Sequence, residues 1–391
     1  MWAILFGLLS LIFVIFTVGS VSALFLYLLE LASRFFVEHD YLIFILPILG
    51  LVTGLTYWFF GKKVPSTKKI LHGVEEKQAL IPFITAFFIF SFTVLSQVFG
   101  AATGRESTAV QFGAALGEFW RDVFAKRVNL KFSRQAYVRC GLAAGFGAVF
   151  GVPWAGALFA VEVTPTRRWT LRYLPLCVLS SFGAHWTALA WGAHHKAYPV
   201  FVALHWDLLL GAKWVCLGVA FGVCAKVFIV LMHYLEKHVF GRIPVAWIRP
   251  AIGGVIVALL TLLMKDIRYN GLGVNLIDAA MTSGVQTFDF AWKSVFTILS
   301  SASGLKGGEV TPMMAVGATL GATISYWLAL PSLYAASLGL ISVFASASHI
   351  PWTGAVMAWE LFGFEAFLPT FIVCWVARRV VGLNGLFALN D

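Results

Sequence analysis

PWAGALFAVE at residues 153–162 is repeated as PWTGAVMAWE at residues 351–360, with the proline, tryptophan, glycine, two alanines and terminal glutamate in register. A second pair precedes it in the same order: GRESTAVQFGAALG at 104–117 and GEVTPMMAVGATLG at 308–321. Small residues are common wherever membrane helices pack closely, but that tendency does not account for the shared Pro-Trp and Glu. We therefore predict two homologous halves, roughly 1–200 and 201–391, within a single transmembrane domain over residues 1–391.

Long charge-free runs place the chain in a membrane. Of its 391 residues, 60% are hydrophobic and 12% are charged, against roughly half and a quarter in a soluble domain. Charge-free runs cover residues 2–29, 41–61, 78–104 and 310–359, and a hydrocarbon core needs about 20 apolar residues. They lack the alternation of barrel strands, so we predict an all-α, multi-pass membrane protein. The net charge of +10 comes from basic clusters at the ends of these runs, which indicates positive-inside anchoring to the lipid bilayer and no nucleic-acid partner.

The repeated Gly-rich segments have the composition of broken membrane helices. In transporters built from two halves, the substrate site lies near the bilayer midplane at such breaks. Gly-rich turns bring backbone N–H groups close to a ligand, and two facing helix N-termini with their positive dipole ends would hold an anion. The candidate anion-binding residues, through backbone or hydroxyl groups, are Gly104, Arg105, Ser107, Thr108, Gly308, Glu309, Val310 and Thr311.

Glu106 is the candidate gating residue. A carboxylate at a helix N-terminus inside the membrane occupies the place of an anion, and it is costly unless it has a function. It would compete with the transported anion and leave when protonated. The structural alternative is a capping carboxylate, or an ion pair with the neighbouring Arg105.

The remaining polar residues point to structure rather than to chemistry. Glu162 and Glu360 each end a repeated segment, and we expect them to bind loop N–H groups or nearby bases. Neither the five cysteines nor the nine histidines show disulfide or metal-ligand spacing. No Ser/His/Asp, paired-carboxylate or phosphate-loop pattern is present. We therefore expect no enzyme activity, no metal and no cofactor.

Together these segments resemble the CLC family of anion channels and anion/proton antiporters. GREST at 104–108 is similar to the family's GREGP segment, GGEVTP at 307–312 to its GxFxP segment, and GKKVP at 61–65 to a degraded GSGIP. Residues 141–162 and 350–361 also follow the family's pattern. The correspondence runs over nearly the whole chain in the family's order.

The resemblance implies a fold and a set of roles. The fold is the CLC type: two inverted-topology repeats of many short tilted helices, in a homodimer with one pathway per subunit. We expect the dimer contact around the two repeated Pro-Trp segments. The resemblance also implies the inner (plasma) membrane of a prokaryotic cell and no cytoplasmic regulatory domain. Glu106 takes the position of the gating glutamate that alternately blocks the anion path and carries a proton. GLFA at 385–388 resembles the segment of the family's central tyrosine, which places the ring of Phe387 at the central site.

Several positions depart from the family's common pattern. The inner serine falls on Lys62, or on Ser66 if the alignment slips, with Lys63 beside them at the inner mouth. The internal proton-transfer glutamate of chloride/proton exchangers falls on Val163, which cannot carry a proton. That loss, with GREST, GGEVTP and the short chain, resembles the fluoride-exporting branch. Against that branch, the Met and Phe expected just after Gly61 are absent, and Phe387 replaces tyrosine.

Two functions follow from this pattern. We predict a secondary transporter that exports fluoride in exchange for protons, with Glu106 competing with the anion. The alternative is a passive or proton-coupled chloride channel or transporter of the same family. Its partners in either case are a halide anion and the proton, and the sequence leaves open both the ion and its stoichiometry with protons.

Overall fold

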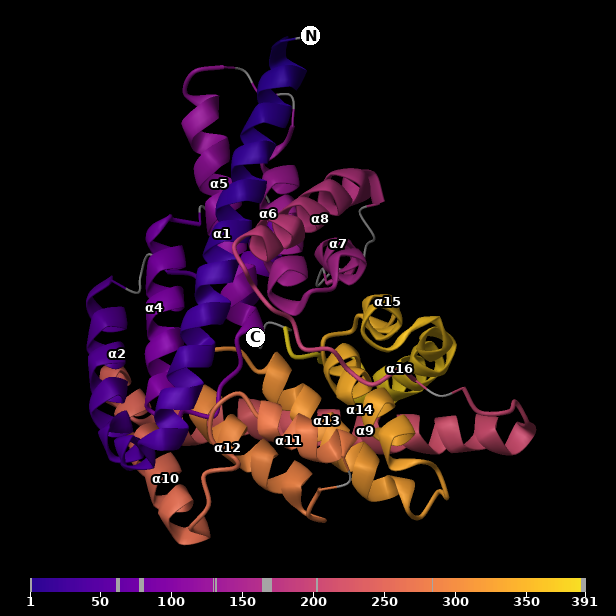
Figure 1. The fold of residues 1–391 in the computed structure, drawn as a ribbon. Coiled ribbons are helices and arrows are strands. Elements are labelled where there is room, and N and C mark those ends of the chain that lie inside the picture. The colour runs from indigo at the N-terminus through magenta and orange to yellow at the C-terminus, as the bar shows by residue number, and fades with distance from the viewer. Residues whose placement is uncertain are drawn as a thin grey trace.

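Helices of very different lengths build the computed structural model of the chain (Figure 1). The structure describes residues 2–60, 64–76, 81–128, 130, 132–163, 171–201, 203–282 and 284–387. Within these ranges it contains sixteen α-helices and no β-strand, as the sequence predicts. The helices are α1 (Trp2–Glu38), α2 (Leu46–Phe60), α3 (Thr67–Glu76), α4 (Ile84–Val98), α5 (Glu106–Ala125), α6 (Arg134–Phe150), α7 (Pro153–Glu162), α8 (Leu174–Ala190), α9 (Leu208–Tyr234), α10 (Arg249–Met264), α11 (Val274–Met281), α12 (Asp289–Ser303), α13 (Val310–Ser325), α14 (Ser332–Ala347), α15 (Pro351–Phe362) and α16 (Phe367–Val381).

Prolines divide the longest charge-free run into short helices. Residues 310–359 form α13, α14 and most of α15, with Pro331 just before α14 and Pro351 as the first residue of α15. Proline fits at a helix start because it lacks an N–H, and its missing N–H and its ring prevent a preceding helix from continuing through it. Four longer segments are apolar enough to cross a membrane: Leu5–Glu38, Asp40–Phe60, Leu208–Arg242 and Ala246–Met264.

The same close helix crossing occurs after each Gly-rich turn. Helix α5 packs against α6, and α13 packs against α14. In the first crossing, a Cβ on Gly113 would collide with the carbonyl of Gly141; in the second, a Cβ on Gly317 would collide with the carbonyl of Gly339. The glycines that repeat between the two segments thus allow two backbones to touch, as small residues do in membrane helix pairs.

Helices α7 and α15 cap one another across the two halves. The Glu162 carboxylate accepts the N–H groups of Trp352 and Thr353 at 3.2 and 2.7 Å. The Glu360 carboxylate accepts those of Trp154 and Ala155 at 2.9 and 2.8 Å. The two glutamates therefore bind backbone N–H groups as expected, but at a helix N-terminus of the other half rather than in a loop. A carboxylate there meets unsatisfied donors and the positive dipole end.

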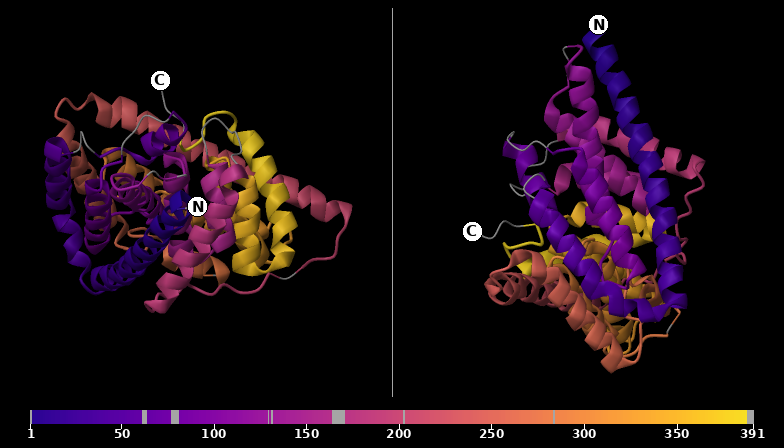
Figure 2. Two further views of the ribbon diagram at one scale, coloured as in Figure 1. Left: turned by 90° about the horizontal axis from the view of Figure 1, so that it is seen from above. Right: turned by 90° about the vertical axis from the view of Figure 1, so that its left-hand side faces the viewer.

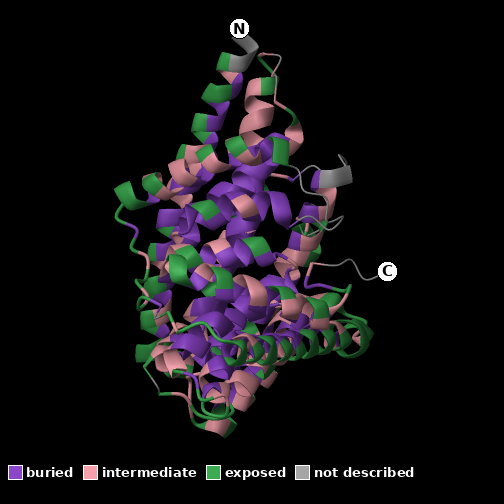
Figure 3. Ribbon diagram, turned by 90° about the vertical axis from the view of Figure 1, so that its right-hand side faces the viewer, coloured by how far each residue is buried: buried purple, intermediate pink, exposed green. Residues whose placement is uncertain are grey.

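The two halves meet along a buried centre. Helices α1 and α4–α6, in indigo and magenta, lie on one side of the molecule, and α10–α14, in orange, lie on the other (Figure 1). The end of α1 nearest the N-terminus and the far end of α5 project together beyond the remaining helices (Figure 2). Buried residues run through the middle of the molecule, and exposed residues lie mainly around its outside (Figure 3).

Candidate functional site

Two Gly-rich turns from opposite halves are joined at the centre. Gly308 N–H donates to the Gly104 carbonyl at 2.8 Å, and Gly104 N–H donates back to the Gly308 carbonyl. Helix α5 begins two residues after Gly104 and helix α13 two residues after Gly308. The two N-termini therefore converge, and the eight residues predicted to bind an anion all lie on these two turns or at the start of the helix that follows each.

The Glu106 side chain fills the space at the start of α13. Its carboxylate is 1% exposed. Oε2 accepts the backbone N–H groups of Thr311 and Arg105, both at 3.0 Å, and the Thr311 hydroxyl donates to Oε1. The Arg105 Nε lies 3.5 Å from Oε1. The carboxyl group thus occupies backbone donors of both helix N-termini, and it also makes the contact with Arg105 that the structural alternative requires.

Two predicted hydroxyl donors bind protein groups in this conformation. Ser107 Oγ donates to Glu309 Oε2 at 3.4 Å, across the junction of the halves. Thr108 Oγ1 lies 2.7 Å from Thr93 Oγ1 on α4. Neither hydroxyl contacts Glu106, whereas that of Thr311 does. Thr311 is therefore the hydroxyl best placed beside the backbone donors.

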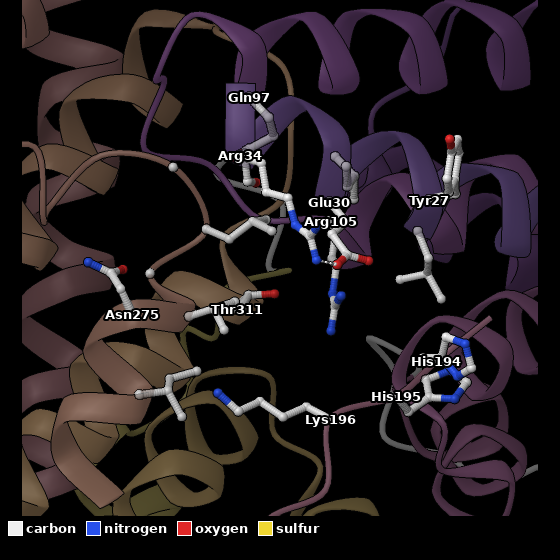
Figure 4. Close-up of a pocket in the computed structure, with 18 of the residues that line it drawn as sticks. Tyr27, Glu30, Arg34, Gln97, Arg105, His194, His195, Lys196, Asn275 and Thr311 are labelled. Carbon is white, nitrogen blue, oxygen red and sulfur yellow. Dashed lines mark hydrogen bonds and ion pairs between the residues drawn. The ribbon is translucent and has the colours of Figure 1, made fainter. Parts of the chain in front are cut away.

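A wide cavity, which we call the vestibule, leads to the two turns. Its volume is about 1120 Å³, and α1, α11, residues 191–198 and the loop before α11 surround it. The Arg105 side chain extends into it between Thr311 and His194 (Figure 4). Both Arg105 and Thr311 contact Glu106. The vestibule is thus lined by a guanidinium group that lies beside the Glu106 carboxylate. Within the described residues no group of His, Cys, Asp or Glu side chains is placed to hold a metal.

A family model described as voltage-gated chloride channel matches residues 49–382. The chain belongs to this family. A curated relative, the "Chloride/fluoride channel protein" of Pseudomonas syringae pv. tomato, is 34% identical over 99% of this chain and 85% of the relative. The "Voltage-gated ClC-type chloride channel ClcB" of Citrobacter koseri is 27% identical over 72% of this chain and 69% of the relative.

Solved structures share the fold of this CLC protein over nearly its whole length. A CLC-type fluoride/proton antiporter has a TM-score of 0.89 at 29% identity and covers 97% of both chains. A slow cyanobacterial Cl−/H+ antiporter has a TM-score of 0.83 at 18% identity, with 98% of this chain and 96% of that chain covered, and shows the fold alone. The chain is thus an integral membrane anion transporter with the CLC fold, and members of this family are channels or antiporters.

The other residues that the sequence suggested for the pathway of this CLC protein lie outside the two turns. Val163 directly follows α7 and is buried. Ser66 is exposed just before α3, where its Oγ accepts the Lys69 N–H at 3.4 Å. Phe387 is half-buried against the core, beside Leu386, whose N–H donates to the last carbonyl of α14 at 2.7 Å. Lys62 and Lys63 lie outside the described residues.

Sequence reasoning missed several side chains around the turns of this CLC protein. The side chain of Glu309, a residue that the sequence suggests as a backbone donor, accepts a hydrogen bond from Ser107. Lys68 on α3 lies 3.0 Å from His233 Nε2 on α9. Gln97 donates to the Thr103 carbonyl at 2.7 Å, just before Gly104. Gln97 could have been found from the sequence, because it is a polar residue inside the charge-free run 78–104 and polar groups at membrane depth are costly.

Proposed function

We propose that this protein exports fluoride across the membrane in exchange for protons, with Glu106 as the residue that links the two. One observation carries the proposal: the Glu106 carboxylate accepts the N–H groups of Arg105 and Thr311 at 3.0 Å each. These groups belong to two helix N-termini from opposite halves. Each such end is equivalent to roughly half a positive charge, so the position suits an anion.

Anion and proton movement are coupled because the Glu106 carboxylate and the anion cannot bind the same N–H groups at once. When Glu106 is ionised, its carboxylate holds the donors and the anion has no place. When Glu106 takes up a proton, it loses its negative charge and much of its strength as an acceptor, because hydrogen bonds to charged groups are about twice as strong as neutral ones. The side chain then leaves with its proton and the anion takes the same N–H groups. Each exchange moves an anion one way and a proton the other.

Fluoride is the ion that these donors suit best. It is smaller than chloride and holds its water more tightly, so its site must supply several strong donors at close range. The Thr311 N–H and hydroxyl both point to one place, which Glu106 occupies in this structure. The names of the chloride/fluoride channel relative and the fluoride/proton antiporter agree with this choice. The edge of the Phe387 ring, which carries partial positive charge, would face the anion further along the path.

A second carboxylate, that of Glu309, lies at the junction of the two turns. Val163 takes the position of the family's internal glutamate and has no titratable group. Glu309 lies at the N-cap of α13 and accepts a hydrogen bond from Ser107, the residue next to Glu106. We propose that Glu309 exchanges protons with the pathway in place of the missing glutamate, since intramembrane carboxylates mark proton relays.

A chloride channel is the second candidate, favoured by Val163 and by the word channel in the names of both relatives. One reconstitution separates the two. Purified protein is placed in liposomes loaded with either fluoride or chloride, and anion efflux and internal pH are recorded together under matched gradients. The proposal predicts fluoride efflux faster than chloride efflux, with protons moving uphill when the fluoride gradient drives them. Faster chloride efflux without proton movement would establish the channel instead.

A further inference from the structure

Helix α12 carries a lysine whose burial calls for an explanation. Lys293 is fully buried, with 0% of its surface exposed. Its Nζ donates to the backbone carbonyls of Tyr269 and Gly271 at 2.9 and 2.7 Å. None of the ion pairs among the described residues includes Lys293. An ammonium group inside a membrane protein is expensive and is a functional candidate by default.

Both carbonyls belong to the loop between α10 and α11. A second residue of α12 also binds this loop. Asp289, one turn before Lys293 and also 0% exposed, accepts from Tyr269 Oη at 2.8 Å and from Arg268 at 3.1 Å. Two buried charges of opposite sign on one helix face therefore fix residues 268–271 through four hydrogen bonds. A loop held in this way has little freedom to move independently of α12.

The fixed loop in turn holds the segment that enters the Gly104 turn. Asn270, which is 5% exposed, donates from Nδ2 to the Gly100 carbonyl at 2.9 Å. Helix α12 also reaches this segment directly, because Ser300 Oγ accepts the Ala102 N–H at 3.2 Å. Residues 100–104 of the first half thus rest on α12 of the second half, and Lys293 supports the longer of the two connections.

We propose that Lys293 is a positioning residue for anion discrimination: through Tyr269, Gly271 and Asn270 it keeps the Gly104 turn from shifting toward a larger anion. The inference rests on the proposed function, because it takes the N–H groups of that turn as anion donors. Productive sites hold their groups to within about 0.5 Å, and a misplacement of about 1 Å costs up to a hundredfold in rate. A turn free to move would adjust to chloride and lose its preference for fluoride.

The test compares two variants that break the same connection at opposite ends. Lys293→Met removes the donor to the loop, and Asn270→Leu removes the donor to Gly100 without changing any charge. Fluoride and chloride efflux rates are measured in liposomes for each variant and for the double variant. Lys213→Met is the matched control, since Lys213 also donates to a backbone carbonyl, that of Ala329 at 3.3 Å, but on the surface.

We expect each single variant to lower the fluoride-to-chloride rate ratio about tenfold, the double variant to lower it no further, and the control to leave it unchanged. Residues acting through one connection give such non-additive effects. If Asn270→Leu leaves the ratio intact while Lys293→Met lowers it, the lysine acts through its charge and the inference is wrong. If either variant does not fold, Lys293→Leu and Asn270→Ala, which also lack a side-chain donor, carry the same comparison. A wild type that prefers chloride would refute the proposed function and the inference with it, whereas unchanged or additive ratios in the variants of a fluoride-selective protein would refute the inference alone.

Discussion

Thr311→Val removes one donor from the proposed anion site and leaves its shape almost unchanged. The Thr311 hydroxyl donates to the Glu106 carboxylate, and its N–H donates to the same group at 3.0 Å. Valine keeps the branched side chain and the N–H but has no hydroxyl. A hydrogen bond to a charged group contributes about 1.5–3 kcal/mol, which corresponds to about tenfold to a hundredfold in an equilibrium or a rate.

The loss affects Glu106 and the anion alike, because both use this hydroxyl in turn. A change in Glu106 affects the fluoride flux and the chloride flux of one variant equally. The ratio of the two fluxes therefore reports the effect of the hydroxyl on the anion alone. Fluoride depends more on close, strong donors than chloride does. We therefore expect the ratio to fall about tenfold in Thr311→Val, the lower end of the range above.

The assay is ion-selective recording of efflux from liposomes that contain equal amounts of folded protein. Thr311→Ser is the control, since serine retains the hydroxyl and should keep the wild-type ratio within about threefold. An unchanged ratio in Thr311→Val, or an equal fall in both variants, would show that this hydroxyl does not select the ion.

Two further predictions concern the assembly of the halves and of the subunits. Glu162→Gln and Glu360→Gln each remove a charged acceptor from two helix N–H groups, so each should lower the free energy of unfolding in detergent by about 1.5–3 kcal/mol; unchanged thermal stability in both would contradict the cap. Trp154 and Trp352 are 45% and 43% exposed on α7 and α15, and we propose that they face a second subunit. Replacing either with Arg should convert a dimer to a monomer by mass measurement in mild detergent, whereas Trp58→Arg on α2 should not; a wild type that is monomeric at every concentration would remove the proposal.

The repeat predicted the core of the fold because its residues have strong local consequences. Pro153 and Pro351 are the first residues of α7 and α15, a position that proline favours, and Gly113 and Gly317 mark crossings that only small residues permit. Glu162 and Glu360 were expected to bind backbone N–H groups, and they do. The sequence did not show that each reaches the opposite half, because that pairing depends on how the halves are placed relative to one another.

The residues that hold the Gly104 turn in place could not be predicted from the sequence, because their contacts also depend on how distant segments are placed relative to one another. Lys293 lies more than twenty residues from the carbonyls it binds, and Asn270 is separated from Gly100 by 170 positions. Neither spacing is periodic, so neither residue stands out. The hydroxyls of Ser107 and Thr108 were considered as anion donors, but a sequence does not tell which of several neighbours a rotating hydroxyl will bind.

The central claim is that the Glu106 carboxylate and the anion compete for one site, and Glu106→Gln tests it most directly. Glutamine retains the shape but carries neither the charge nor the proton. Fluoride flux and proton flux are recorded together in liposomes, with wild-type protein beside the variant. The account predicts that the variant folds, keeps its dimer mass and shows no proton movement driven by the fluoride gradient. Proton-coupled fluoride movement at the wild-type rate in Glu106→Gln would show that Glu106 only caps α13, and it would contradict the account.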